Sequence, residues 1–259
     1  MTFPAQGQRR FERPPHPFRY YDLCVIVFVV VLIISNLIGP KIVAAGPFRI
    51  SGAQLLFPIT YIFGDIFTEV YGYAGSRRAI WLGFFGSALM ALMGIIVVAL
   101  PPAPDFKDQA AFATVFGFVP RMVGASLAAY WAGEFANSYV MAKMKVLTQG
   151  KALWMRTIGS TAVGQFVDSV VIMTLAFAGK ESWATIGNLI FSGYVGKVAY
   201  EALMTPFTYL AVNWLKRVEG VDVYDVDTNF SPFASGTEGE RFVVLEPAQP
   251  GGEITRQPS

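Results

Sequence analysis

YIFGDIFTEVYGYAGSRR, residues 61–78, carries two carboxylates through an apolar run and ends on a pair of arginines. Asp65 and Glu69 are four residues apart and therefore share one face of a helix, with Tyr61 one turn before Asp65. Ionisable side chains are costly in hydrocarbon, so such a face is expected to meet a cavity or a partner. The remaining chain is interpreted as the helical bundle that encloses it.

The composition is that of a membrane protein. Of the 259 residues, 54% are hydrophobic and 15% are charged, whereas soluble domains average about 25% charged residues. The single cysteine, Cys24, excludes an intrachain disulfide and a cysteine metal cluster. The single histidine, His16, lies in a Pro/Arg-rich tail, so we expect neither a metal site nor a cofactor. The sequence contains no G-x-x-x-x-G-K-[ST] loop, which excludes nucleotide hydrolysis by that route.

The apolar runs predict an all-α membrane protein with six transmembrane helices, each of roughly 20 residues or more. Residues 1–19 form a basic N-terminal tail that we expect to be disordered, and 20–217 form the six-span domain. A polar cytoplasmic segment, 218–233, precedes a second disordered tail, 234–259. The last span is long, so tilt or a kink near Pro206 is expected. The predicted spans are about 20–39, 53–73, 79–100, 121–142, 157–178 and 186–214.

The placement of lysine and arginine predicts the orientation of these spans. The connections after the first, third and fifth spans hold few basic residues: Lys41, Arg49, Lys107 and Lys180. The opposite side is much richer, with Arg9, Arg10, Arg13, Arg19, Arg77, Arg78, Lys143, Lys145, Lys151, Arg156, Lys216 and Arg217. Both termini are therefore predicted to be cytoplasmic under the positive-inside rule. The third connection, 101–120, is expected to be a loop with room for a short interfacial helix.

Polar side chains in the spans are expected to meet inside the bundle, because lipid would penalise them. Lys197 lies at about the same depth as Asp65 and Asp168, which makes an ion pair with either aspartate plausible. Acids outnumber bases, so some must be protonated, hydrated or waiting for a cation or hydrogen-bond donor. The candidates are Asn36 in the first span, Asp65 and Glu69 in the second, Arg121, Glu134 and Asn137 in the fourth, Gln165 and Asp168 in the fifth, and Tyr194, Lys197 and Glu201 in the sixth.

A structural role remains open for many of these residues. The Glu134/Asn137 and Gln165/Asp168 pairs equally fit interhelical hydrogen bonding. Lys197 and Glu201 fit an internal pair that fixes helix register, and Arg121 fits an interfacial anchor. The aromatic residues Tyr61, Phe166, Trp131 and Tyr194 fit ordinary packing as well as ligand stacking.

Two kinds of chemistry suit an acidic intramembrane cavity. Asp65 and Asp168 raise the possibility of an aspartyl protease dyad, in which two carboxylates share a proton. However, position 62 is Ile, where the G-x-G-D pattern of that class needs Gly. The favoured interpretation is a pocket for a polar planar molecule or a cation. A carboxylate accepts two parallel hydrogen bonds from an amidine-like edge, and aromatic rings supply stacking faces. Buried acids can also carry protons and couple transport to a gradient.

Blocks spread over several spans resemble the YhhQ-type queuosine precursor transporters, also called the vitamin uptake transporter family. The likeness covers about residues 21–233. Its blocks are PITYIFGDIFTEVYGYAGSRR (58–78), the R-x-x-x-A-S core within 121–145, STAVGQFVD (160–168), KVAYEALMTP (197–206) and DVYDVDTNFSPF (222–233).

The resemblance implies a non-enzymatic importer of 7-deazaguanine precursors of queuosine, in their cyano or aminomethyl form, for salvage into tRNA modification. It implies a bacterial inner-membrane location, with lipid and the small molecule as partners and no nucleic acid bound. The family is similar in size and span count to the substrate-binding subunits of energy-coupling-factor importers but is thought to work without their ATPase. A subunit of an ATP-driven importer therefore stays as one alternative, and a membrane protease as another.

Carried onto this chain, the motif acids are Asp65, Glu69 and Asp168, and the motif bases are Arg121 and Lys197. We expect Asp65 or Asp168 to accept the substrate's donors, with Lys197 fixing the carboxylates. The complete substrate-binding prediction is Asn36, Tyr61, Asp65, Glu69, Arg121, Gln165, Phe166, Asp168, Tyr194 and Lys197, with Glu134, Asn137 and Glu201 in supporting or coupling roles.

Overall fold

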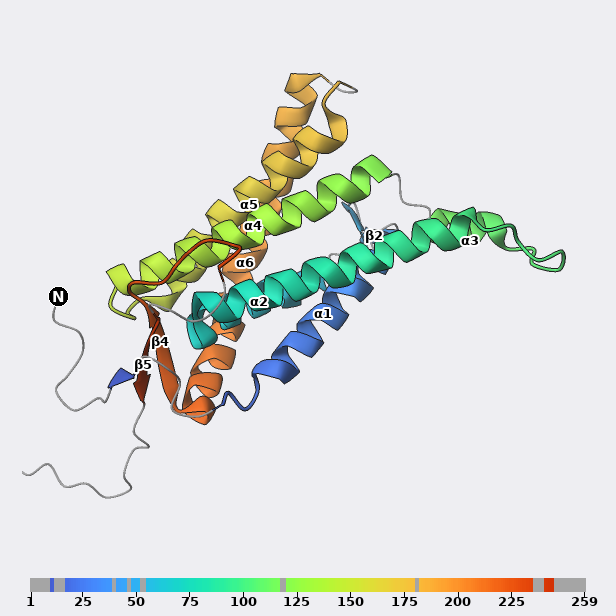
Figure 1. The fold of residues 1–259 in the computed structure, drawn as a ribbon. Coiled ribbons are helices and arrows are strands. Elements are labelled where there is room, and N and C mark those ends of the chain that lie inside the picture. Colours follow the sequence, from blue (N-terminus) through green and yellow to red (C-terminus); the bar gives the residue numbers. More distant parts are fainter. Residues whose placement is uncertain are drawn as a thin grey trace, which may run out of the picture.

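The computed structural model describes residues 10–11, 17–38, 41–45, 48–51, 55–116, 120–179, 182–234 and 240–244. This part of the chain is mainly helical (Figure 1). Helix α4 packs most extensively on α5, while α2 packs on α1 and α4, and α6 packs on α5. The helices are α1 (Tyr21–Ile38), α2 (Phe57–Ala99), α3 (Gln109–Phe116), α4 (Pro120–Leu147), α5 (Leu153–Phe177) and α6 (Trp183–Glu219).

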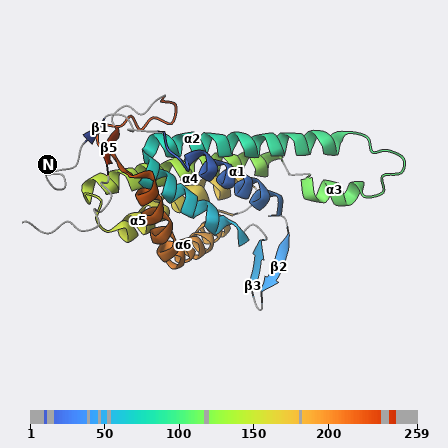
Figure 2. The ribbon, with the colours of Figure 1, turned by 90° about the horizontal axis from the view of Figure 1, so that it is seen from below.

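Helix α2 is broken at Gly72 into two arms that run in different directions (Figure 2). Gly72 has φ 76° and ψ 175°, a backbone conformation that is essentially limited to glycine. The break frees backbone groups, and the Tyr73 N–H donates to both Asp225 carboxylate oxygens at 3.2 Å. The predicted second and third spans are thus the two arms, and no loop from 73 to 79 separates them.

Two small antiparallel sheets accompany the helices. Strands β2 (Ile42–Ala45) and β3 (Phe48–Ser51) pair with Ile42 opposite Ser51. The other sheet has the order β1-β5-β4, from Arg10–Phe11, Glu240–Val244 and Val221–Asp225. We expected the two tails, 1–19 and 234–259, to be disordered, whereas β1 and β5 lie in them. The strands are rich in β-branched and aromatic residues, which favour strands, and each has a partner strand.

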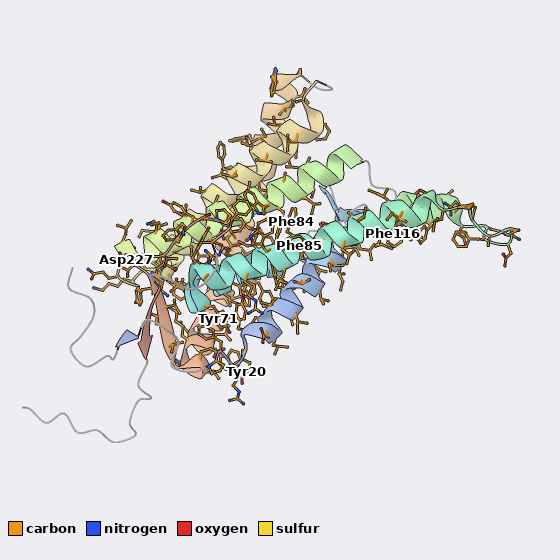
Figure 3. All side chains as sticks on the ribbon, viewed as in Figure 1. Tyr20, Tyr71, Phe84, Phe85, Phe116 and Asp227 are labelled. Carbon is orange, nitrogen blue, oxygen red and sulfur yellow. The ribbon has the colours of Figure 1, made fainter. Side chains whose placement is uncertain are left out.

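The β1-β5-β4 sheet and the β2–β3 hairpin lie at opposite ends of the bundle, as do Asp227 and Phe116 (Figures 1 and 3). The sheet end also contains the α2 break and the end of α6. There Glu219 accepts hydrogen bonds from the Arg19 and Tyr20 backbone N–H groups, both at 2.8 Å. The starting point of the first helix is therefore fastened to the end of the last.

The segment after β4 covers the start of the second arm of α2. Arg77, 5% exposed, donates to the Asn229 and Ser231 carbonyl oxygens. The Trp81 indole donates to the Pro232 carbonyl at 2.9 Å. Our prediction gave Arg77 a role in setting the orientation in the membrane; in addition, its side chain is buried and holds this segment.

The outer faces of the bundle are apolar. Leu89 of α2, Phe191 of α6 and Leu210 of α6 are between 60% and 71% exposed, a pattern suited to lipid rather than water. Among the described residues, three stretches are long and apolar enough to cross a membrane: Tyr21–Ile38, Ile62–Ala99 and Leu153–Leu175. The protein is therefore a helical membrane protein. Helix α3 lies in the predicted loop 101–120, and α6 continues through Pro206.

Candidate functional site

A cavity of about 200 Å³ lies between the helices, with polar residues from five of the helical segments around it. It is smaller than the roughly 300–1,000 Å³ of sites for drug-sized ligands, so it suits a small ligand such as a single bicyclic ring. Its polar lining residues are Asn36, Thr60, Ser87, Ser126, Tyr130, Glu134, Asn137, Thr161, Gln165, Asp168 and Lys197.

An ion pair between α5 and α6 forms part of the cavity wall. Lys197 Nζ donates to Asp168 Oδ2 at 2.6 Å, which confirms the ion pair with Asp168 that the sequence suggested. The side chains are 34% and 22% exposed, so solvent or a ligand can reach both. Asp168 Oδ1 and the nearby Glu134 remain as acceptors with no second basic residue among the lining residues. The cavity therefore holds two acids and one base.

Two glycines bring Asp168 and Asn137 to the cavity. A Cβ at Gly133 of α4 would lie 2.9 Å from the Asp168 Cβ, and one at Gly164 of α5 would lie 2.7 Å from the Asn137 Cβ. In each helix the glycine precedes the polar residue by four positions, so the helices cross with each polar side chain next to the other's glycine. Close backbone approach thus sets the spacing of these two side chains.

Asp65 and Glu201 lie outside the cavity lining and are fully buried. Neither carboxylate makes a hydrogen bond among the described residues. Glu201 is the charged group that acts most strongly on Asp65, and Thr157, Asn137 and Glu134 also face it. Asp65 does not pair with Lys197, the second pairing suggested by the sequence, because Asp168 occupies the lysine.

Glu69 belongs to a different cluster, the basic-end cluster, defined as Glu69, Lys145, Arg156, Lys216 and Asp222. Arg156 Nη2 and Lys216 Nζ donate to Glu69 Oε1 at 2.7 and 2.6 Å. Lys145 and Lys216 also reach Asp222 Oδ1 at 2.7 and 2.8 Å. Burial alone raises the pKa of Asp222, but the two lysines more than offset it and hold the pKa well below its usual range. Two acids and three bases are therefore joined where α2, α4, α5, α6 and β4 meet.

The structure divides the predicted site residues into separate groups. The cavity brings together Asn36, Glu134, Asn137, Gln165, Asp168 and Lys197. Glu69 lies in the basic-end cluster, away from the cavity lining. Phe166 and Tyr194 contact each other edge-on at 6.0 Å between ring centroids, and neither lines the cavity. The side chains of Tyr61 and Arg121 lie outside the described residues.

Sequence reasoning missed several residues that the fold brings to these sites. Tyr130 is the aromatic residue of the cavity lining, and its hydroxyl donates to the Ile80 carbonyl at 3.3 Å. Ser87 lines the cavity from the second arm of α2, where it accepts a hydrogen bond from Asn36 at 3.3 Å. No spacing in the sequence distinguishes either from ordinary packing residues, although Ser87 interrupts an otherwise apolar run.

Comparison with known proteins indicates the family of the chain. Residues 51–211 match the profile of a family described as "Putative vitamin uptake transporter". The chain belongs to this family. Membership makes it a transporter and not an enzyme, which removes the protease alternative. No solved structure matches the chain.

A curated member of similar sequence is known from Bacillus subtilis (strain 168). It is 30% identical over 169 residues, which cover 64% of this chain and 73% of the relative. That protein is described as "Probable queuosine precursor transporter". The matched region of the vitamin uptake transporter family includes the cavity residues from Thr60 to Lys197.

Proposed function

We propose that this chain imports queuosine precursors, the 7-cyano- and 7-aminomethyl-7-deazaguanines, across the bacterial inner membrane. The substrate class follows from the described function of the Bacillus relative and from the chemistry of the cavity. In this proposal the chain is a multi-pass protein with six spans, counting each arm of α2 as one, and with both termini in the cytoplasm. The clustering of basic residues at the sheet end supports that orientation.

The observation that carries the proposal is the partly exposed Asp168–Lys197 pair in an otherwise acidic cavity. A 7-deazaguanine presents N1–H and an exocyclic amine on one edge, and two carboxylate acceptors match this pair of donors. We place Asp168 and Glu134 at that edge. Lys197 holds Asp168 in position and can donate to the carbonyl oxygen of the base.

Other lining residues would complete recognition of the ring. Tyr130 offers an aromatic face, and base–aromatic stacking contributes about 1–3 kcal/mol in nucleic-acid binders. Asn137 and Gln165 carry amides that can donate to ring nitrogens. Asn36 lies on the other wall, where it is bonded to Ser87. A cavity of about 200 Å³ favours a single bicyclic base over a nucleotide or a larger vitamin.

The test is restoration of queuosine in cells that cannot make it. Such cells should regain the modified tRNA nucleoside from supplied precursor only when this chain is present, and Asp168→Asn and Lys197→Met should each remove that recovery. Asp105→Asn, in an exposed loop, is the control for loss of a carboxylate. Protein level in the membrane is measured for each variant.

The choice of host separates secondary transport from an ATP-driven complex. Recovery in a host that lacks an energy-coupling ATPase module supports transport by this chain alone. Recovery that appears only when such a module is supplied would mean that the chain is a substrate-binding subunit. No recovery with the unaltered chain in either host, despite normal membrane levels, would refute the proposed substrate.

A further inference from the structure

The buried pair Asp65 and Glu201 is not explained by substrate binding. Both carboxylates are 0% exposed, and neither makes a hydrogen bond among the described residues. Thr157, also 0% exposed, is the side chain of α5 that interacts with Asp65. Polar side chains from α2, α5 and α6 therefore lie buried together, and the two acids among them have no basic partner among the described residues.

The charged groups around the pair do not neutralise it. Glu134 of α4 faces both Asp65 and Glu201, and it also faces Asp168. Lys197, one turn before Glu201 on α6, donates to Asp168 at 2.6 Å. Arg156, next to Thr157 on α5, has its guanidinium on Glu69. One further acid, Glu134, thus acts on the pair, and the two neighbouring bases Lys197 and Arg156 have other partners.

Two ionised carboxylates in such a place would be very unfavourable. An isolated buried charge costs far more than an unpaired neutral group, and adjacent acids prefer to share a proton. A metal ion is a poorer occupant, because no three acidic, histidine or cysteine side chains among the described residues come together to hold one. A proton removes one of the two charges and needs no further ligands.

We propose that Asp65 and Glu201 form a proton-coupling site, separate from the substrate cavity. This rests on the proposed function. The link between the two sites is Glu134, which lines the cavity and also faces the buried pair. A substrate that places an N–H donor on Glu134 reduces the repulsion between Glu134 and the pair. In the outward-facing form a proton enters through the cavity, and in the inward-facing form it leaves to the cytoplasm with the substrate.

The coupling is tested with the purified full chain in proteoliposomes, using labelled 7-cyano-7-deazaguanine and a clamped membrane potential. With the exterior one pH unit more acidic than the interior, coupling to one proton allows about tenfold accumulation. Glu201→Gln and Asp65→Asn are expected to reduce the accumulation ratio to one while retaining exchange of substrate at equal pH. Asp105→Asn should accumulate substrate like the unaltered chain.

A milder variant and a direct measurement guard against misfolding of the acid variants. Thr157→Val keeps both carboxylates, and it should shift the pH at which accumulation is half-maximal. A pH-sensitive dye inside liposomes of the unaltered chain should report acidification that depends on substrate. Substrate transport without that acidification would overturn the proton site and leave the importer intact, as would a sodium gradient that replaces the pH gradient. Absence of all transport would instead count against the proposed function.

Discussion

The cavity and the basic-end cluster use the same kinds of side chain for opposite purposes. In the basic-end cluster, Glu69 is completely buried and contacted by three bases, so its charge is fully compensated. In the cavity, Lys197 compensates Asp168, and Glu134 has no basic partner among the described residues. The difference teaches that an acid inside this bundle is held by ion pairs where bases are in excess. In the cavity acids are in excess, and we infer that the partly exposed Asp168 remains available to a ligand.

Removing the central acid of the basic-end cluster should have the largest effect. Glu69→Gln leaves Lys145, Lys216 and Arg156 with Asp222 as their remaining acid, and breaking a buried ion pair costs about 3–5 kcal/mol. We expect a large loss of thermal stability in detergent and low protein levels in the membrane. Glu134→Gln is the matched control and should melt close to the unaltered protein. Equal destabilisation by both would contradict the contrast.

Removing a cavity acid should instead impair binding. Asp168→Asn takes a charged acceptor from the substrate edge, and hydrogen bonds to charged groups contribute about 1.5–3 kcal/mol. Equilibrium binding of 7-cyano-7-deazaguanine is expected to weaken by about 10- to 150-fold with little change in melting temperature. Unchanged affinity would mean that Asp168 only fixes the helix contact with Lys197.

The close contact of α4 and α5 offers a smaller perturbation of the cavity. In Gly164→Ala the new Cβ would lie 2.7 Å from the Asn137 Cβ and 2.9 Å from the Gly133 carbonyl oxygen, so the helices must separate. Overpacking of this kind costs about 1–3 kcal/mol. Gly124→Ala, on the same α4, meets nothing within 4 Å and should be neutral. Melting curves and substrate affinity of the two variants provide the comparison.

The smallest expected effect of the basic-end cluster is on the pH dependence of the free energy of unfolding. Because the pKa of Asp222 is lowered in the folded protein, its contribution is complete above its unfolded pKa and is lost as pH falls toward the folded value. Asp222→Asn should therefore lower stability at neutral pH and flatten the loss at acid pH. Burial raises the pKa of Asp225, so Asp225→Asn should change the slope in the opposite sense. Parallel acid-melting curves for all three proteins would contradict this assignment.

Much of the cavity could be predicted from sequence because local periodicity determines which residues share a helix face. The spacing placed Asp168 on the same helix face as Gln165, and the depth of Lys197 matched that of Asp168. Together they predicted the observed ion pair between Asp168 and Lys197. The location of Glu69 could not be predicted, since Arg156 and Lys216 are 87 and 147 positions away and reach it only through tertiary packing. The same periodicity gave Glu69 and Asp65 one face, and both are fully buried, yet Glu69 contacts three bases whereas Asp65 contacts none among the described residues.

The fold shows the same limit. Apolar runs located the helices, but the direction change at Gly72 depends on a backbone conformation that hydropathy does not record. Strand β4 depends on Glu240–Val244, a partner from the tail that we expected to lack regular structure. These features arise from pairing between distant segments, so composition alone underestimates the order near the chain ends.

The hydrogen bond from the Tyr73 N–H to Asp225 can form only after most of the chain has been synthesised. The two arms leave the ribosome early, whereas the carboxylate that receives the freed N–H is translated only after α6 is complete. During membrane insertion, the break at Gly72 therefore lacks this hydrogen bond until the segment after α6 has been translated. Truncating the protein just after α6 would remove the hydrogen-bond acceptor for a helix break that lies more than a hundred residues earlier in the chain.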